Sequence, residues 1–188
     1  MHKLYALCDQ SSLDSRNLSL EDFVNLAKKH NAEIIQYRNK DASTETIKAS
    51  LIELRQLWDG FLIVNDKYEL ISLCDGVHMG QEDLLKIDAD IEYAVIKIRE
   101  IIGKEKLLGI STHNETEITK ANIMDLDYIG LGAFKQTLTK NVTNLLGDTL
   151  DTLAGNSKHK VAAIGGVKLD DKFKNVTYLV IGSGLYES

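Results

Sequence analysis

The stretch that decides the fold is residues 60–83, which read GFLIVNDKYELISLCDGVHMGQED. It contains two short apolar runs, 60–64 and 76–79, and each is followed at once by a turn that carries a carboxylate. If the runs are neighbouring parallel strands, Asp66 and Asp83 lie on adjacent loops at the same face of the sheet. Such a pair can hold a hard cation such as Mg²⁺, which takes one or two carboxylates together with substrate phosphates.

The pattern of short apolar runs continues along the whole chain. It predicts eight strands, at residues 3–8, 32–37, 60–64, 76–79, 106–110, 128–131, 160–164 and 178–181. Near-continuous apolar runs of this kind are typical of strands that are buried on both faces. Eight units favour a single domain over 1–188, folded as an α/β (β/α)8 TIM barrel, with a doubly wound open sheet as the alternative.

Amphipathic segments separate the predicted strands, as a parallel sheet requires. Apolar residues recur at helical spacing in 20–27 after a start signal at Ser19 and Asp22, and again in 47–58 and 91–102. No helix is predicted after 178–181, so the barrel is expected to be a short version that lacks the final helix. Without that helix, apolar side chains on the outside of the barrel would be exposed. A homo-oligomer partner, or a shift of the neighbouring helices, would have to cover them.

Composition narrows the classes of function. The formal net charge of −6 over 188 residues argues against a nucleic-acid-binding surface. No apolar run is long enough to span a membrane, and the start of the chain lacks the apolar core of a signal peptide, so a cytoplasmic location is expected. Cys8 and Cys74 have no metal-type spacing, which indicates reduced thiols in the core.

Polar residues and glycine turns follow seven of the predicted strands. Each has an ordinary explanation when taken alone: a helix cap for Asp66 or Asp83, a solvated loop for the basic residues, a surface histidine for His113 and a simple turn for the glycines. Their joint position at the active-site face of a barrel favours a ligand site instead. The residues are Gln36, Arg38, Lys40, Asn65, Asp66, Gln81, Asp83, Ser111, His113, Thr137, Thr139, Lys140, Gly165, Gly166, Gly182, Ser183 and Gly184.

These residues divide into two candidate anion sites. The glycine turns at 165–166 and 182–184 offer backbone N–H groups for a phosphate, with Thr137 and Thr139 as hydroxyl donors. Arg38, Lys40 and Lys140 combine with the carboxylate pair, and cations beside a carboxylate pair suggest a diphosphate bound through Mg²⁺. A site with both features can join two phosphorylated molecules and expel diphosphate.

Six motifs in this order resemble the thiamine phosphate synthase family. They are QYRNK at 36–40, VNDK at 64–67, DGVHMGQED at 75–83, GISTH at 109–113, TLTK at 137–140 and IGG at 164–166. The resemblance implies a (β/α)8 barrel that couples a hydroxymethylpyrimidine diphosphate, the pyrimidine substrate, to a thiazole phosphate. Diphosphate leaves first, and the thiazole nitrogen then attacks the resulting cation.

The resemblance also implies residue roles. Asp66 and Asp83 would bind Mg²⁺, while Gln36 and Ser111 would contact the pyrimidine. Arg38, Lys40, Asn65 and Lys140 would hold the diphosphate, and Arg38, Lys40, Ser111 and Lys140 would carry the catalysis. Thr137, Thr139, Gly166 and Ser183 would form the thiazole phosphate pocket.

Two alternatives remain open at the level of sequence. A related thiazole tautomerase of the same fold tends to lack the two carboxylates and uses a histidine at the position of His113. A paralogue without turnover could instead bind the thiamine precursors only. The two carboxylates and the TLTK motif favour the synthase.

Overall fold

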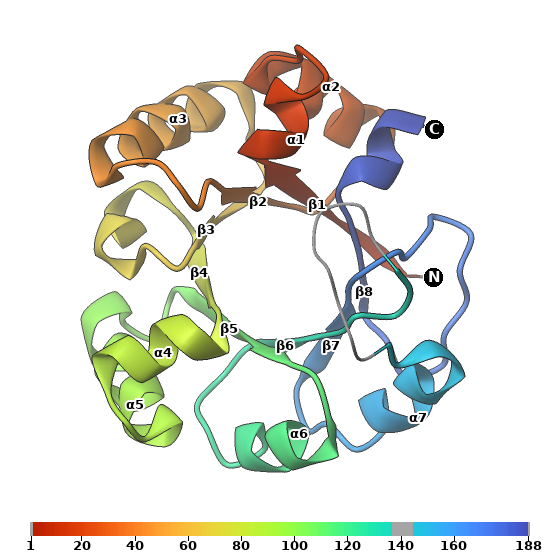
Figure 1. Cartoon of the computed structure of the whole chain (residues 1–188). Helices are drawn as coiled ribbons and strands as arrows, with labels where there is room; N and C mark the ends of the chain where they lie inside the picture. The colour runs from red at the N-terminus through yellow and green to blue at the C-terminus, as the bar shows by residue number, and fades with distance from the viewer. Residues whose placement is uncertain (1, 137–144, 188) are drawn as a thin grey trace.

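The computed structural model describes residues 2–136 and 145–187 and contains a closed barrel of eight parallel strands in sequence order (Figure 1). Closure is direct, because β1 pairs with β8 from Lys3↔Tyr178 to Ala6↔Ile181. The predicted barrel is therefore confirmed and the open sheet is wrong. The strands are β1 (Lys3–Asp9), β2 (Ile34–Arg38), β3 (Phe61–Asn65), β4 (Gly76–Met79), β5 (Leu107–Thr112), β6 (Tyr128–Leu131), β7 (Lys160–Ala163) and β8 (Tyr178–Ile181).

Helices surround the strands as an outer ring (Figure 1). They are α1 (Gln10–Asp14), α2 (Leu20–Lys29), α3 (Thr44–Leu57), α4 (Gln81–Ile87), α5 (Ile91–Ile102), α6 (Glu115–Ala121) and α7 (Leu150–Ala154), with 3-10 helices η1 (Tyr68–Leu73), η2 (Gly147–Thr149) and η3 (Ser183–Glu187). Only η1 separates β3 from β4, which keeps the two loops of the carboxylate pair on adjacent strands. Within the described ranges no α-helix follows β8.

The predicted start signal of α2 is confirmed. Ser19 and Asp22 form a reciprocal capping box at the start of α2, in which each side chain bonds the backbone N–H of the other. The side chain of Asn114 caps α6 by accepting from the N–H of Glu117. Not every apolar residue of the helical segment 91–102 is buried, since Ile101 in α5 is 56% exposed.

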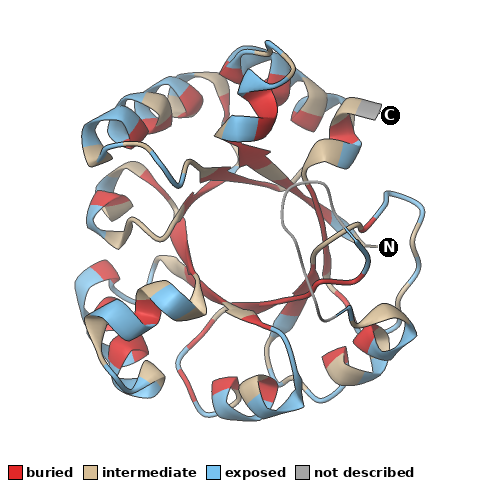
Figure 2. Cartoon of the chain, in the orientation of Figure 1, coloured by how far each residue is buried: buried red, intermediate tan, exposed pale blue. Residues whose placement is uncertain are grey.

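Apolar side chains fill two layers, and the buried positions follow the ring of strands and the inward sides of the helices (Figure 2). The larger layer lies between strands and helices and includes Cys8 and Cys74, which are free and buried as predicted. The smaller layer fills the barrel interior and includes Tyr5, Tyr128 and Tyr178. Tyr5 and Tyr128 bring phenolic hydroxyls into the barrel interior, where the two oxygens lie 2.9 Å apart.

The 3-10 helix η3 packs beside α2, at the edge where a final helix would lie. Leu185 is fully buried, and the ring of Tyr186 lies 6.1 Å from that of Phe23. The Arg16 guanidinium stacks over the Tyr186 ring at 4.7 Å. η3 thus covers part of the outer surface that the sequence left open. None of the helices in the described part of the chain is long and apolar enough to cross a membrane.

Candidate active site

The two predicted metal carboxylates meet over Gly80. Asp66 directly follows β3 and has a positive φ of 62°, a backbone conformation that aspartate tolerates better than most residues. Its Oδ1 accepts from the backbone N–H of Gly80 at 2.8 Å. A Cβ built on Gly80 would lie 3.4 Å from Oδ2 of Asp83 and 3.6 Å from Oδ1 of Asp66. Both distances are ordinary van der Waals contacts, so Gly80 marks the point where the two carboxylates come close to each other.

The pair is electrostatically unequal. Burial raises the pKa of Asp66, and the charge of Asp83 raises it further, against the hydrogen bond from Gly80 and the charge of Lys40. Burial also opposes ionisation of Asp83, but the hydrogen bond and charge of Lys86, at 2.7 Å, hold its pKa below the ordinary value. Each negative charge makes ionisation of the other carboxyl group less favourable. A cation between the two groups would stabilise the state in which both are ionised.

The two carboxylates suit Mg²⁺ better than a metal whose ligands must all come from protein side chains. The described ranges contain no group of three or more histidine, cysteine or acidic side chains suited to a metal. Two carboxylates on adjacent loops are what Mg²⁺ uses when substrate phosphates and waters complete its shell. The residues present therefore fit the ion that the sequence suggests.

Gln36 and Asn65 connect β2 and β3 beside the carboxylates. Gln36 is buried, and its Nε2 donates to Oδ1 of Asn65 at 2.7 Å. The Nδ2 of Asn65 donates in turn to Oδ2 of Asp66 at 2.5 Å. Three of the predicted site residues thus form one hydrogen-bonded row along the rim.

Arg38 is oriented by a residue that sequence reasoning missed. Asp9, at the end of β1, is 4% exposed and forms an ion pair with the Arg38 guanidinium. Burial alone would raise the pKa of Asp9, but hydrogen bonds from Ser11 and Arg38 hold it below its usual value. The sequence did give one indication of this role, because Asp9 lies one residue beyond the predicted first strand. Lys40 is exposed and lies close enough to Asp66 and Asp83 for its charge to lower both of their pKa values.

Ser111 sits at the end of β5 and faces the barrel interior. Its Oγ lies 3.0 Å from Nε2 of His78, and its backbone carbonyl accepts from Nε2 of Gln81 at 2.5 Å. Nδ1 of His78 lies 3.1 Å from the hydroxyl of Tyr128. His78 belongs to the DGVH motif and Tyr128 begins a predicted strand, yet neither was singled out as a site residue.

Gly166 and Ser183 lie on the opposite side of the rim, at the ends of β7 and β8. The barrel order places these strands four positions away from β3 and β4. Gly166 has φ +66°, and a Cβ there would come within 2.9 Å of Cβ of Lys135 and 3.0 Å of the carbonyl oxygen of Gln136. The turn therefore needs glycine to pack against the loop that follows β6. This separation agrees with two distinct anion sites.

The remaining predicted residues divide into two kinds. Thr137, Thr139 and Lys140 lie outside the residues that the structure describes. His113 is exposed just before α6, where its Nδ1 pairs with Oε2 of Glu117 at 2.9 Å. This is the surface position that the ordinary explanation of His113 predicts.

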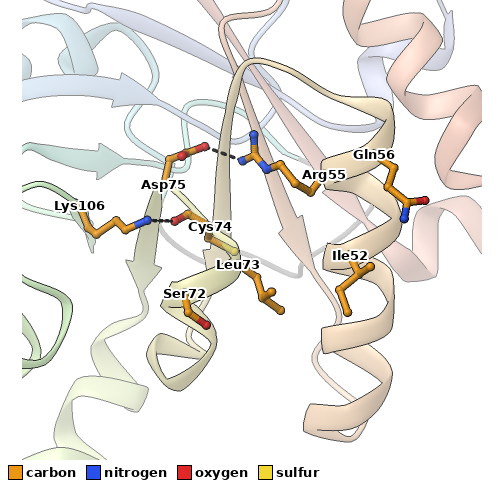
Figure 3. A pocket seen from close by; sticks show the side chains of 8 residues that line it. All are labelled: Ile52, Arg55, Gln56, Ser72, Leu73, Cys74, Asp75 and Lys106. Atoms are coloured by element: carbon orange, nitrogen blue, oxygen red, sulfur yellow. Dashed lines mark hydrogen bonds and ion pairs between the residues drawn. The ribbon is translucent and has the colours of Figure 1, made fainter.

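A separate hollow of about 440 Å³ lies at the N-terminal ends of the strands, beside α3 and η1. Figure 3 shows Arg55 directed at Asp75, 2.6 Å away, and Lys106 directed at the backbone carbonyl of Cys74, 2.5 Å away. Oδ2 of Asp75 also accepts from the N–H of Leu62 at 2.8 Å. The charged groups of this hollow therefore link the N-terminal ends of neighbouring strands. In barrels that face contributes to stability, whereas catalysis takes place at the opposite face.

Comparison with known proteins agrees with this architecture. The family model described as thiamine monophosphate synthase matches residues 4–177. The thiamine-phosphate synthase of Lawsonia intracellularis is 36% identical over 172 residues, covering 88% of this chain and 74% of that protein. The protein of the same name from Clostridium acetobutylicum is 30% identical over 181 residues, covering 92% and 80%.

Solved structures give the same result. The thiamine phosphate pyrophosphorylase of Pyrococcus furiosus superposes with a TM-score of 0.74 at 26% identity, covering 97% of this chain and 87% of that one. A geranylgeranylglyceryl phosphate synthase from Thermoplasma acidophilum reaches a TM-score of 0.65 at 12% identity, which shows a shared fold only.

Proposed function

Because this chain belongs to the thiamine monophosphate synthase family, we propose that it couples hydroxymethylpyrimidine diphosphate to a thiazole phosphate. In the first step the bond between the methylene carbon and the diphosphate oxygen breaks, and its electron pair leaves with diphosphate. The thiazole nitrogen then donates its lone pair to the cationic carbon. The products are thiamine phosphate and diphosphate.

The observation that carries this proposal is the meeting of Asp66 and Asp83 over Gly80, with Lys40 near enough to influence both. Mg²⁺ held by the two carboxylates would neutralise charge on the departing diphosphate. Arg38 and Lys40 supply fixed positive charge on the same rim. Charge that is in place before the bond breaks lowers the barrier without reorganisation.

The other residues position the two substrates. Gln36 and Ser111 project from β2 and β5 and would hold the pyrimidine ring, and Asn65 would add a donor to the diphosphate. Gly166 and Ser183 across the rim would hold the thiazole phosphate. The sequence motif alone assigns Lys140 to the diphosphate and Thr137 and Thr139 to the thiazole phosphate.

The tautomerase alternative has weaker support, because it depends on His113. That side chain is exposed and bonded to Glu117, while the carboxylates that a tautomerase tends to lack are present and face each other.

One assay separates the candidates. The protein is mixed with both substrates and Mg²⁺, and thiamine phosphate and diphosphate are measured. We expect both products, with loss of turnover in EDTA and recovery on adding Mg²⁺. Isomerisation of the thiazole in EDTA would indicate the tautomerase, and tight binding of both substrates by calorimetry without diphosphate release would indicate the non-catalytic paralogue.

A further inference from the structure

A row of hydrogen bonds begins at the half-buried Asp66 and crosses the barrel interior, where its central members are buried. The amide nitrogen of Asn65 donates to Oδ2 of Asp66, so the carboxylate is the acceptor at this end of the row. The amide oxygen of Asn65 then faces Gln36 and accepts from its Nε2. Gln36 is left with Oε1 on its far side, as an acceptor. The first two hydrogen bonds therefore both point toward Asp66, from Gln36 to Asn65 and from Asn65 to the carboxylate.

Two tyrosines continue the row in the same direction. The hydroxyl of Tyr5 donates to Oε1 of Gln36 at 2.7 Å. A phenol has one proton, so the Tyr5 oxygen accepts from the hydroxyl of Tyr128, 2.9 Å away. The proton of Tyr128 is then committed as well. Its oxygen can only accept from Nδ1 of His78, at 3.1 Å.

The tautomer of His78 determines which atom donates in its hydrogen bond with Ser111. The histidine side chain is enclosed in the barrel and stacks on the Tyr128 ring, with centroids 5.6 Å apart. Both ring nitrogens face uncharged hydroxyl groups, those of Tyr128 and Ser111, and burial in such surroundings favours the neutral imidazole. A neutral imidazole has one N–H, and Tyr128 places it on Nδ1. Nε2 is therefore an acceptor, and Ser111 Oγ must donate to it.

The backbone makes room for this row at two glycines. A Cβ on Gly109 would lie 2.1 Å from Cζ of Tyr128, far closer than two carbon atoms can approach without a bond. A Cβ on Gly130 would lie 3.0 Å from Cε1 of His78. Gly109 pairs in register with both His78 and Tyr128, on the strands to either side. The glycine of the GISTH motif thus has a specific reason to be a glycine.

We propose that Tyr5, Tyr128 and His78 are positioning residues that commit the Ser111 proton to His78 and leave Ser111 Oγ as an acceptor toward the ligand. The ligand group that meets Ser111 is then a hydrogen-bond donor, such as an exocyclic amino group on the pyrimidine. An acceptor at that place would face the lone pairs of Ser111. The choice of ligand rests on the proposed function, whereas the hydrogen-bond direction does not.

The direct test is the tautomer of His78, read by nitrogen-15 NMR of the whole protein near neutral pH. The chain has five histidines, and the His78 signals are those that disappear in His78→Gln. We expect the wild-type proton on Nδ1. In Tyr128→Phe and in Tyr5→Phe the row is cut, and we expect the proton to shift substantially to Nε2. Wild-type protonation on Nε2, or no shift in either folded variant, would overturn the proposal.

Tyr178→Phe is the matched control. Tyr178 belongs to the same interior cluster, and its ring lies 6.2 Å from that of Tyr5 in an edge contact, but its hydroxyl is not a member of the row. The same ring exchange should therefore leave the His78 tautomer unchanged. A shift in this variant would point to general loosening of the barrel interior.

The functional test compares two pyrimidine diphosphates, one with an exocyclic amino group and one with a methoxy group that only accepts. We expect wild type to prefer the amino compound in kcat/KM, and Tyr128→Phe to reduce that preference about tenfold, the effect of one hydrogen bond. An unchanged preference would contradict the assigned direction. Failure of wild type to release diphosphate from either compound would refute the proposed function. The NMR result would still test the direction of the hydrogen bonds in the row.

Discussion

The backbone N–H of Gly80 donates to Oδ1 of Asp66 at 2.8 Å, and this bond ties the end of β3 to the start of α4. Asp83 lies in the first turn of that helix. A single contact therefore sets where both carboxylates stand relative to each other. A Cβ at position 80 would be in ordinary contact with both carboxylates, so Gly80 lies where the two approach each other.

Replacement of either carboxylate should remove the metal site without unfolding the barrel. Asp66→Asn is the appropriate variant because asparagine also tolerates the positive φ at this position. We expect Asp66→Asn and Asp83→Asn each to lower Mg²⁺-dependent diphosphate release by about 100-fold or more. Mn²⁺ binding, followed by electron paramagnetic resonance, should weaken in parallel. The exposed neighbour Glu82 supplies the control, Glu82→Gln, which should behave as wild type.

Asp9 should matter through Arg38. In Asp9→Asn the guanidinium loses its buried carboxylate partner and gains freedom of orientation. We expect KM for the pyrimidine diphosphate to rise about tenfold, with KM for the thiazole phosphate nearly unchanged. Steady-state kinetics with each substrate varied in turn measures both values. Asp14→Asn, in the same short helix region but exposed, should change neither; an equal rise in both KM values for Asp9→Asn would show a general disturbance of the rim instead.

The sequence predicted the barrel because its signals are local. Apolar runs bounded by polar turns mark each strand, and the strands at 76–79, 128–131 and 178–181 match the structure at both ends. The rim residues followed from the rule that barrel sites form at the C-terminal ends of strands. Residues such as Asn65 and Asp66 needed only that rule and their own position.

The interior row could not be predicted in the same way, because it depends on register across strands far apart in sequence. Tyr5 and Tyr128 are 123 residues apart, yet their hydroxyls lie 2.9 Å from each other. A tyrosine within an apolar run also looks like any core residue until the direction of its side chain is known. Helical spacing alone does not decide burial either, since Ile101 lies in the amphipathic segment 91–102 but is exposed.

His78 should make stability depend on pH in a defined window. Its folded pKa is about 4 and its ordinary value is 6.5, so on acidification the unfolded chain takes up the proton first. The contribution to stability is complete above pH 6.5 and is lost as the pH falls toward 4, to a total of about 3 kcal/mol. Urea unfolding at several pH values measures this. His78→Gln should lose less stability across the same window; an equal pH dependence in both proteins would contradict the assignment.

Gly109 offers a test of the interior packing that needs no ligand. In Gly109→Ala the new Cβ would lie 2.1 Å from Cζ of Tyr128 and would force the ring or β5 to move. Because well-packed interiors resist added volume, we expect a loss of about 2–4 kcal/mol in the free energy of unfolding. Gly182→Ala is the matched control, since its nearest neighbour, the carbonyl oxygen of Leu7, is at an ordinary 3.5 Å. That substitution should change stability by less than about 1 kcal/mol. Equal effects of the two changes in urea unfolding would mean that Tyr128 does not occupy the space beside Gly109.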